Sequence, residues 1–304
     1  LTRVGYKFVT FYYDEFSADQ VSGSVTPVTA QTTFQTADND TIIFAYYTAN
    51  VITITLSAKD GENNVTISGA TDNKIYVKFD TSTLYSVNTD GALSTVAKVS
   101  ATRPGYIFNG FVNGEDEVVI NTSSELASDW TIDADTTLYA DFTADTFEII
   151  YSAGAEDGVT LPSSPVSYTI ESDLTLALPT RNGYIFQGWR PTENVGLIGE
   201  EYSWKTSELY ENGTSVNGKY GDVTLVATWE PDTYEITYEL REGESFAGTY
   251  TATQEYKIVG NYSLYPTTAI TRAGYTLSGF TVASETANGW TKGEVISAGA
   301  SLNN

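Results

Sequence analysis

The chain has 304 residues, 41% of them hydrophobic and 13% aromatic, which is enough to build cores and argues against wholesale disorder. Its net charge of -24 repels nucleic acid and anionic membrane surfaces, so neither is expected as a partner. No stretch approaches the roughly 18 consecutive apolar residues of a transmembrane helix, and no secretory signal pattern opens the chain.

Three residue types, cysteine, histidine and methionine, do not occur. Without cysteine there is no disulfide, no thiolate nucleophile and no cysteine-ligated zinc. Without histidine the commonest general base and metal ligand is missing. We therefore expect no enzyme activity, no catalytic residues, no cofactor and no metal site. A chain that lacks methionine is also expected to be a processed product or an internal segment of a longer protein.

One short motif occurs four times, as Thr-Arg-x-Gly-Tyr-x-Phe or, in the last copy, with Leu277 at the end. An aromatic residue follows three positions later, preceded by glycine in three copies and by Thr10 in the first. The copies begin at Thr2, Thr102, Thr180 and Thr271, which gives spacings of 100, 78 and 91 residues. Such unequal spacing predicts modules of about 80 to 100 residues with loop insertions, not a tight solenoid.

Alternating polar and apolar residues predict strands at the same places in each module. We call the strand that ends a module the closing strand; it is expected at 41–47, 136–142 and 223–229. After a joint of four or five residues comes the opening strand of the next module, expected at 52–56, 147–151 and 234–238. A hairpin is then expected at 77–85, 168–176 and 256–264.

These elements predict a mainly antiparallel β protein, α+β at most. Its parts are a partial repeat at 1–47, repeat modules at 51–142 and 146–230, and a partial repeat at 233–304 that lacks its closing strand. Since short joints limit bending, the modules are expected to stack into an elongated array.

The motif itself predicts a tight turn followed by a strand. In Arg103-Pro104-Gly105-Tyr106, proline presets its own φ and glycine accepts a positive φ, which fits a type II turn. The second glycine of the motif, Gly110 in this copy, predicts a bulge that re-aims the next aromatic. We expect the aromatic side chains, the tyrosine included, to fill the module interior.

The pattern T-R-x-G-Y-x-F-x-G-W, followed by a T-L-Y-A strand and a Y-x-I-x-Y strand, closely resembles the Listeria–Bacteroides repeat, also called the internalin-type B repeat. The resemblance covers essentially the whole chain, and the departures are Thr10, Leu277 and an insertion around 86–101. It implies a small β-grasp-like module with a curved sheet and little helix. It also implies a secreted, often wall-anchored bacterial protein that uses such units as spacers or adhesive segments.

Three tryptophans are the candidate ligand contacts, because they fall in the variable stretch after the motif: Trp130, Trp204 and Trp290. Trp189 and Trp229 alternate with Phe or Tyr in other copies, which indicates core packing. Clusters of acidic residues match no calcium-loop pattern and suggest no glycosidase cleft; they are Asp38/Asp40, Glu115–Glu117, Asp133/Asp135 and Glu200-Glu201. A lysine–asparagine crosslink at Lys78 is an open alternative.

The sequence therefore favours a non-enzymatic, extracellular structural or adhesive segment of a cell-surface or cell-wall protein, acting as a stalk or a fibre-forming element. The alternative is an adhesin module whose variable loops, 112–132 and 190–222, bind a glycan or a surface protein. The expected partners are neighbouring repeats of the same or identical chains. Head-to-tail donation of the closing strand at 41–47 to the last module is a further hypothesis.

Overall fold

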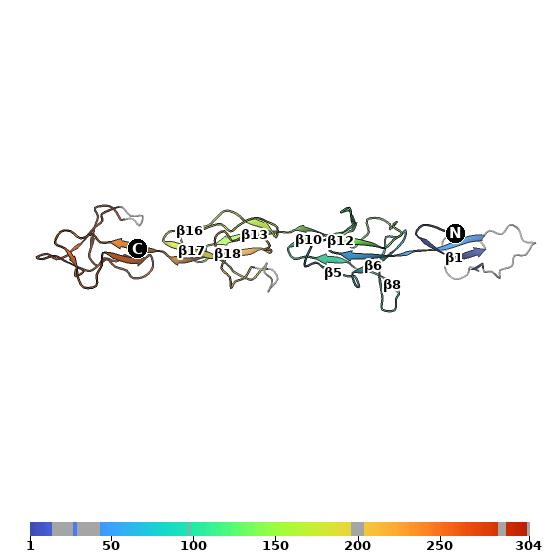
Figure 1. Ribbon diagram of the computed structural model, residues 1–304, viewed down its shortest axis with the longest axis horizontal. Helices are drawn as coiled ribbons and strands as arrows, with labels where there is room; N and C mark the ends of the chain where they lie inside the picture. The colour runs from blue at the N-terminus through green and yellow to red at the C-terminus, as the bar shows by residue number, and fades with distance from the viewer. Residues whose placement is uncertain (14–26, 29–42, 97, 196–203, 285–289, 303–304) are drawn as a thin grey trace, which may run out of the picture. The chain divides into compact units, whose positions relative to one another are not determined.

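The structure is a computed structural model that describes residues 1–13, 27–28, 43–96, 98–195, 204–284 and 290–302. Two compact units, Leu1–Asp145 and Thr146–Asn304, make up the chain (Figure 1). Every regular element in the described ranges is a β-strand, so the predicted β-rich class is confirmed. The boundary between the units falls at one of the expected joints.

Unit 1 contains two main sheets. The first has the order β2-β1-β3 and belongs to the expected partial repeat. The second has the order β11-β10-β12-β4-β6-β7-β8, and a small separate sheet pairs β5 with β9. The strands are β1 (Tyr6–Tyr13), β2 (Pro27–Val28), β3 (Ile43–Ala49), β4 (Val51–Ser57), β5 (Thr66–Ser68), β6 (Lys74–Lys78), β7 (Leu84–Val87), β8 (Leu93–Thr95), β9 (Ser100–Thr102), β10 (Tyr106–Val112), β11 (Val118–Ile120) and β12 (Thr136–Ala144).

Unit 2 contains a four-stranded sheet of order β15-β13-β18-β17 and four two-stranded sheets, β14-β16, β19-β21, β20-β22 and β23-β24. The strands are β13 (Thr146–Ser152), β14 (Val159–Thr160), β15 (Ser167–Thr169), β16 (Thr180–Arg181), β17 (Tyr184–Pro191), β18 (Val223–Pro231), β19 (Thr233–Thr237), β20 (Ser245–Phe246), β21 (Thr253–Lys257), β22 (Ile270–Thr271), β23 (Gly279–Thr281) and β24 (Val295–Ser297).

The two complete repeats share one strand order. Opening strand and closing strand run parallel at the centre, with Thr136 beside Ile54 in the first and Val223 beside Ile149 in the second. An antiparallel strand flanks each of them, which gives β6-β4-β12-β10 and β15-β13-β18-β17. The opening and closing strands are central and form the floor of the core, so both must be present before the module interior is covered.

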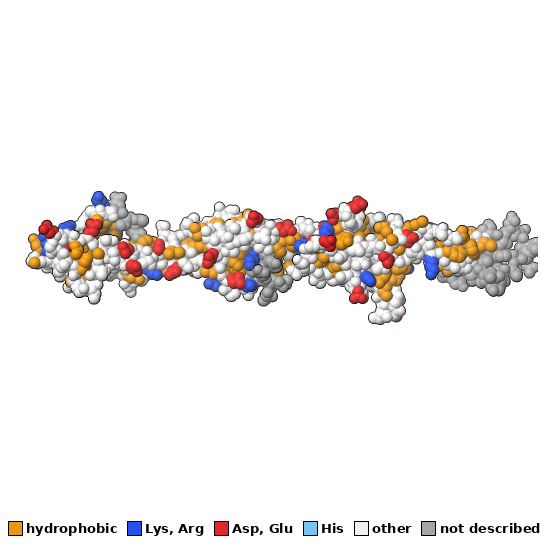
Figure 2. Space-filling view, viewed as in Figure 1, with side chains coloured by type: hydrophobic (Ala, Val, Ile, Leu, Met, Phe, Trp, Pro, Cys, Tyr) orange, Lys and Arg blue, Asp and Glu red, His pale blue; other side chains and the backbone are white. Residues whose placement is uncertain are grey.

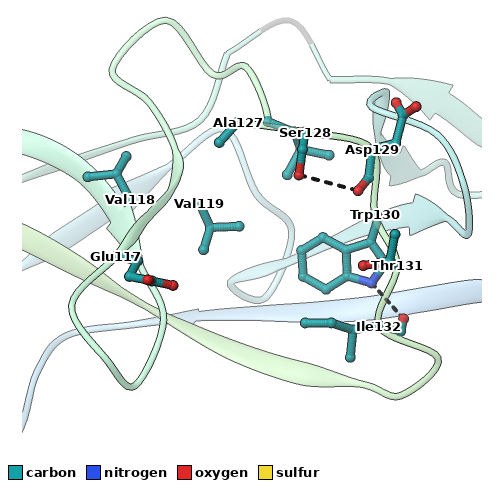
Figure 3. A pocket seen from close by; sticks show the side chains of 10 residues that line it. Glu117, Val118, Val119, Ala127, Ser128, Asp129, Trp130, Thr131 and Ile132 are labelled. Atoms are coloured by element: carbon teal, nitrogen blue, oxygen red, sulfur yellow. Dashed lines mark hydrogen bonds between the residues drawn. The ribbon is translucent and has the colours of Figure 1, made fainter.

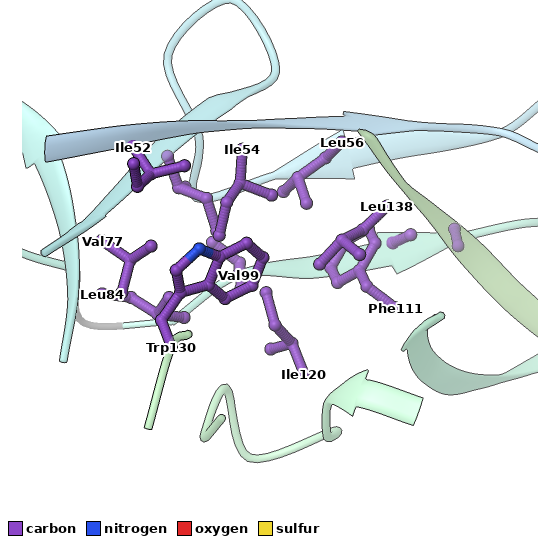
Figure 4. Packing of buried hydrophobic residues seen from close by; sticks show 13 residues of the cluster. Ile52, Ile54, Leu56, Val77, Leu84, Val99, Phe111, Ile120, Trp130 and Leu138 are labelled. Atoms are coloured by element: carbon purple, nitrogen blue, oxygen red, sulfur yellow. The ribbon is translucent and has the colours of Figure 1, made fainter. Parts of the chain in front are cut away.

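Alternation along these strands fills one core per complete repeat. In the first repeat Ile52, Ile54 and Leu56 of β4 point inward, and Figure 4 shows Trp130, Val99 and Ile120 packed beneath them. In the second repeat the corresponding cluster contains Ile149, Leu225 and two fully buried tryptophans, Trp189 and Trp204. Period-two alternation that places one face against a core is what the sequence predicted.

The predicted bulge is confirmed at the second glycine of the motif. The pairing between motif strand and closing strand shifts register between Phe108 and Gly110, and again between Phe186 and Gly188. A Cβ on Gly110 would lie 2.5 Å from the Ile120 carbonyl oxygen, so the backbone approach there is too close for a side chain, and a Cβ on Gly188 would lie 2.6 Å from Leu209 Cγ. A third shift lies between Phe8 and Thr10, which shows that threonine also accommodates this bulge.

Hairpins are confirmed in the first complete repeat only. There β6 and β7 pair, with Val77 beside Leu84. In the second repeat Thr169 and Ser172 close a turn, but Leu176 binds Thr214 of a distant loop instead of returning along β15. The insertion around 86–101 in the first repeat forms the extra strand β8, and the hairpin with β7 projects from unit 1 in Figure 1.

Candidate functional site

The four motif copies adopt one turn. The tyrosine N–H donates to the arginine carbonyl at 3.1 Å in the copies at Arg3, Arg103 and Arg272. The glycine at the third turn position has φ between 77° and 79° in all four. A side chain disfavours that left-handed conformation, which explains why this glycine is constant in the four copies while the residue before it varies among Val, Pro, Asn and Ala.

In every copy the arginine stacks on the tyrosine of its own turn. The guanidinium carbon lies 3.9, 3.8, 3.7 and 4.6 Å from the ring centroid in the copies at Arg3, Arg103, Arg181 and Arg272. The expectation that the tyrosine fills the interior is therefore wrong. Tyr275 is 71% exposed, and the other three rings are half-buried under their arginines.

The remaining aromatics of the motif do build the core. Phe108 packs edge-on against Phe111 at 5.1 Å and lies 5.7 Å from Phe142 of the closing strand. Phe186 repeats this arrangement with Trp189 and Trp229, at 5.2 and 5.5 Å. Tilted or edge-to-face rings at these separations attract each other beyond their buried area, so the triad fastens motif strand to closing strand.

The joint between repeats is the site that recurs most closely. One residue separates each closing strand from the next opening strand: Asn50, Asp145 or Asp232. Its N–H donates to the carbonyl of the motif glycine, Gly5, Gly105 or Gly183, at 2.9 Å in all three cases. The predicted joint of four or five residues is thus too long, because the strands extend to within one residue of each other.

The joint inside unit 1 carries further contacts. Asp133 accepts hydrogen bonds from the Gly5 N–H (2.9 Å) and from the Asn50 side-chain amide (2.7 Å). The Tyr6 hydroxyl donates to Asp80 at 3.0 Å, and the Tyr6 ring packs edge-on against Phe79 at 5.6 Å. A Cβ on Gly5 would overlap the Phe79 ring. The motif turn is therefore the docking surface for the following module.

These hydrogen bonds shift the pKa values of Asp133 and Tyr6 at the joint. The Asn50 amide, followed by the Gly5 N–H, lowers the pKa of Asp133 below its usual value, so that this carboxylate stays ionised. Donation to the Asp80 carboxylate is the largest cause of the raised pKa of Tyr6, which keeps the phenol protonated. Both groups hold the form that the hydrogen bonds require.

The joint inside unit 2 uses an aliphatic residue in place of the ring. Thr233 pairs with Lys257 as Val51 pairs with Lys78, so Ile258 occupies the position of Phe79. A Cβ on Gly183 would lie 2.5 Å from Ile258 Cδ1, which places this side chain directly on the glycine. Lys257 lies 3.9 Å from Glu230 of the closing strand, a peripheral ion pair of small energetic value.

A second aspartate position anchors each closing strand to its opening strand. Asp135 Oδ1 accepts from the Thr53 N–H at 2.8 Å, and Asp222 Oδ1 accepts from the Glu148 N–H at 2.8 Å. Both aspartates directly precede the closing strand, so the bond fixes where the parallel pairing starts. Asp133 and Asp135 thus each accept from a backbone N–H far away in the sequence, that of Gly5 and that of Thr53.

The candidate ligand tryptophans have different surroundings. Trp130 is 4% exposed and Trp204 is 0% exposed, so neither ring presents a face to a ligand. Trp130 Nε1 donates to the Ile132 carbonyl (2.8 Å), and Trp204 Nε1 donates to the Tyr168 hydroxyl (2.8 Å). Burial of the ring with its N–H satisfied is the signature of a core tryptophan. Trp290 is half-buried and keeps part of its ring accessible.

A shallow cavity of about 230 Å³ lies beside Trp130, between β11 and the segment before the closing strand (Figure 3). Val118 and Ile132, at 46% and 51% exposed, form its apolar wall, and Glu117 and Asp129 lie at its rim. Pockets for small-molecule substrates usually have volumes of about 300–1,000 Å³. This cavity is smaller and suits a single side chain.

Lys59 lies between two carboxylates, 2.6 Å from Asp141 and 2.9 Å from Asp116, and Asn109 donates to Asp141 at 3.0 Å. The hydrogen bond to Asp141, then that to Asp116, raises the pKa of Lys59. For Asp141, burial acts to raise the pKa, but the bonds from Lys59 and Asn109 outweigh it and the pKa is lowered. Both groups remain charged, so this is an ion pair and not a reactive amine.

Other charged groups take structural positions. The Lys78 ammonium lies 5.2 Å above the Tyr85 ring, in a cation–π contact. Figure 2 shows acidic side chains scattered over the visible face of both units, not gathered at one place. Within the described ranges no group of three or more acidic residues converges as a metal site would require. Asp38, Asp40, Glu200 and Glu201 lie outside those ranges.

The described residues contain no helix long and apolar enough to cross a membrane.

Repetition marks the joint residues only in part. Asn50, Asp145 and Asp232 stand at equivalent positions, and Asp133 has a counterpart in Asp38, but the second complete repeat has Tyr220 there. The aspartate before each closing strand does recur, as Asp40, Asp135 and Asp222, and this was the available signal for the strand anchor.

Comparison with known proteins agrees with the repeat geometry. Neither a curated protein nor a solved structure matches the chain. Residues 147–228 match the family model of the Listeria–Bacteroides repeat domain, and the matched range runs from the opening strand to the closing strand of the second complete repeat. That segment of the chain is a Listeria–Bacteroides repeat.

Proposed function

We propose that this chain is a non-enzymatic, extracellular spacer, a run of β-grasp-like repeats that forms part of a bacterial surface stalk or fibre. The observation that carries the proposal is the joint, where one residue links consecutive strands and donates to the motif glycine in the same way three times. A spacer needs a short, hydrogen-bonded link at each joint, because such a link transmits mechanical force from one strand to the next with little extension of the chain between them.

Two further observations support this proposal. The central parallel pair with one antiparallel strand on each side supports the β-grasp-like part of the proposal, although the described residues of these repeats form no helix. The recurring phenylalanine and tryptophan side chains pack in the core, as do Trp130 and Trp204, and the motif tyrosines stack on arginine. The motif therefore serves the fold and the joint and presents no constellation suited to catalysis.

The experiment is a length series. Chains with one, two or three added copies of residues 146–232 are imaged by electron microscopy and measured by small-angle scattering. A spacer lengthens by the same increment with each copy. A matched control carries a Gly-Ser-Gly-Ser insertion after Asp232 in each added copy, and it is expected to be shorter and more variable in length at equal copy number. Compact particles of constant length in the uninterrupted series would refute the proposal.

The alternative function, a recognition module, has one specific observation in its favour. The β7–β8 hairpin is an addition that the second repeat does not share, and it projects from unit 1. Leu84 and Thr95 of this hairpin line a second open cavity together with Leu126. Glycan-array and peptide-array binding of the whole chain tests it. Loss of binding in a variant with residues 88–92 replaced by Gly-Gly would support recognition at the hairpin. If no glycan or peptide on the arrays binds, the spacer function is the remaining proposal.

A further inference from the structure

The cavity beside Trp130 has walls that are apolar and open to solvent. Val118 on β11 and Ile132 before β12 are 46% and 51% exposed, and Leu126 adds to the same lining. Figure 3 shows Val119 and Ile132 next to the Trp130 ring, which closes the inner end. Exposed aliphatic side chains gathered around a hollow and bordered by polar groups are typical of an interaction surface.

Backbone hydrogen bonds hold this cavity in shape. The Ala127 N–H donates to the Val119 carbonyl at 3.0 Å and so fixes one part of the wall against another. The Trp130 N–H donates to the Thr81 carbonyl at 3.0 Å, and the Trp130 carbonyl accepts from the Asp80 N–H at 2.7 Å. Binding therefore requires little ordering of the surface, because the hollow is formed already.

The rim of the cavity is acidic. Glu117 and Asp129 both line it and are both exposed (Figure 3). No lysine or arginine among the described residues forms an ion pair with either carboxylate. Lys59 reaches this loop but pairs with Asp116, and residues 104–180 contain no lysine or arginine. An apolar hollow is thus bordered by negative charge that this part of the chain does not neutralise.

We propose that the cavity docks a cationic polypeptide segment, which inserts one large apolar side chain beside Trp130 and places lysine or arginine side chains on Glu117 and Asp129. Charge complementarity carries this choice of partner. In an extended segment alternate side chains point the same way, so basic residues two positions before and after the apolar one face the rim. The inference does not depend on the spacer function, since a spacer can carry a docking site along its length.

Other occupants fit this site less well. A nucleic acid or an anionic lipid surface would be repelled by Glu117 and Asp129. A sugar ring needs an open aromatic face, but Trp130 is 4% exposed and its Nε1–H is donated to the Ile132 carbonyl. A second copy of this chain carries a net charge of -24, which opposes its approach to an acidic rim. An apolar side chain between positive charges meets none of these objections.

The test titrates the end-blocked peptide Ser-Lys-Ser-Leu-Ser-Lys-Ser into the isotope-labelled whole chain and follows the indole resonances by nuclear magnetic resonance. We expect a saturable shift of the Trp130 indole, while the indole of Trp204, 0% exposed, stays in place. Replacing the leucine of the peptide by serine removes the apolar anchor and should weaken binding about tenfold or more. Replacing both lysines by glutamate should abolish saturable binding, because the rim then repels the peptide.

Matched variants of the chain locate the binding. Ile132→Ser should weaken binding of the leucine peptide about fivefold, because part of the apolar wall is lost. Ile107→Ser is the control and should leave binding unchanged, since Ile107 is 50% exposed but lies outside the cavity lining. Asp129→Asn should weaken binding about twofold to fivefold. Glu115→Gln removes a charge from the same loop but outside the lining, and it should have a smaller effect.

A Trp130 indole that does not shift at millimolar peptide, or equal binding of the leucine and serine peptides, would overturn the proposal. Equal losses in Ile132→Ser and Ile107→Ser would place the peptide elsewhere and would overturn it as well. Self-association that shifts the Trp130 indole without peptide would show that the occupant is a second copy and not a cationic partner. The spacer test measures particle length and not binding, so either proposal can fail while the other stands.

Discussion

The indole N–H of Trp204 donates to the hydroxyl of Tyr168 at 2.8 Å, and that hydroxyl donates to the Gly221 carbonyl at 2.6 Å. The two rings meet edge to face, with centroids 6.2 Å apart. This buried relay ties the loop after the motif strand to β15 and to Gly221, two residues before the closing strand. Burial is the main cause of the raised pKa of Tyr168, so the phenol stays neutral and the relay stays complete at ordinary pH.

Tyr168→Phe is expected to destabilise the second repeat by about 1–3 kcal/mol, because it leaves a buried indole N–H and a carbonyl without their partner. Hydrogen exchange of residues 146–230 in the whole chain measures the local opening free energy. In a double-mutant cycle with Trp204→Phe, the two losses should be less than additive. Additive losses would show that the bond contributes no coupling.

Gly183→Ala tests the joint inside unit 2. Gly213→Ala is the matched control, since Gly213 has φ of 81° against 79° for Gly183 and has nothing within 4 Å of its Cβ position. Backbone strain alone costs about 1–2 kcal/mol at either site. Gly183→Ala should cost more, because the new methyl group displaces Ile258, and Ile258→Ala in the same chain should recover the excess. Thermal unfolding of the two single variants and the double variant gives the comparison, and equal losses for both glycines would contradict direct packing at the joint.

Arg181→Lys tests the arginine–tyrosine stack. The Arg181 guanidinium lies 3.7 Å from the Tyr184 ring centroid, donates to the Asp157 carbonyl at 3.1 Å and pairs with Glu156 at 2.7 Å. Lysine keeps the charge but not the planar fork, so a loss of about 1 kcal/mol is expected. Arg190→Lys is the control, because Arg190 binds the Thr206 carbonyl outside the motif. The two variants are compared by denaturant unfolding, and equal effects would show that stacking adds nothing specific.

The sequence predicted the repeating part of this fold well, because repetition itself carries the information. Opening and closing strands, the turn glycine and the bulge at the second glycine all recur at fixed offsets, and each corresponds to a backbone requirement. The prediction of core packing from the phenylalanine or tyrosine in other copies is confirmed for both tryptophans: Trp189 is fully buried, and Trp229 is partly buried against the same core. The family was also predicted correctly for residues 147–228.

What the sequence could not predict depends on loops that occur once. Trp130 and Trp204 lie in segments without a counterpart, so nothing in the sequence distinguished a core anchor from an exposed ligand platform. The motif tyrosine was misplaced for a different reason. Strand alternation puts Tyr106 on the same face as Phe108, but the tyrosine lies at the strand end beyond the core, where Arg103 covers it. Periodicity gives the face of a residue and not the extent of the core.

The joint aspartate gives a prediction about acid. The pKa of Asp133 is lowered in the folded chain, so its contribution is present above the unfolded pKa, near 3.8, and is lost as pH falls through the folded value. Exchange at the Gly5 amide, corrected for the intrinsic pH dependence, should therefore accelerate below about pH 4. The variant Asp133→Asn should remove the dependence, because the amide does not titrate and its single oxygen can serve only one of the two donors, the Gly5 N–H or the Asn50 amide. Asp129→Asn, close in sequence, is the control and should behave as the unmodified chain. A Gly5 amide that stays equally protected in acid and in Asp133→Asn would show that the joint is held without this carboxylate.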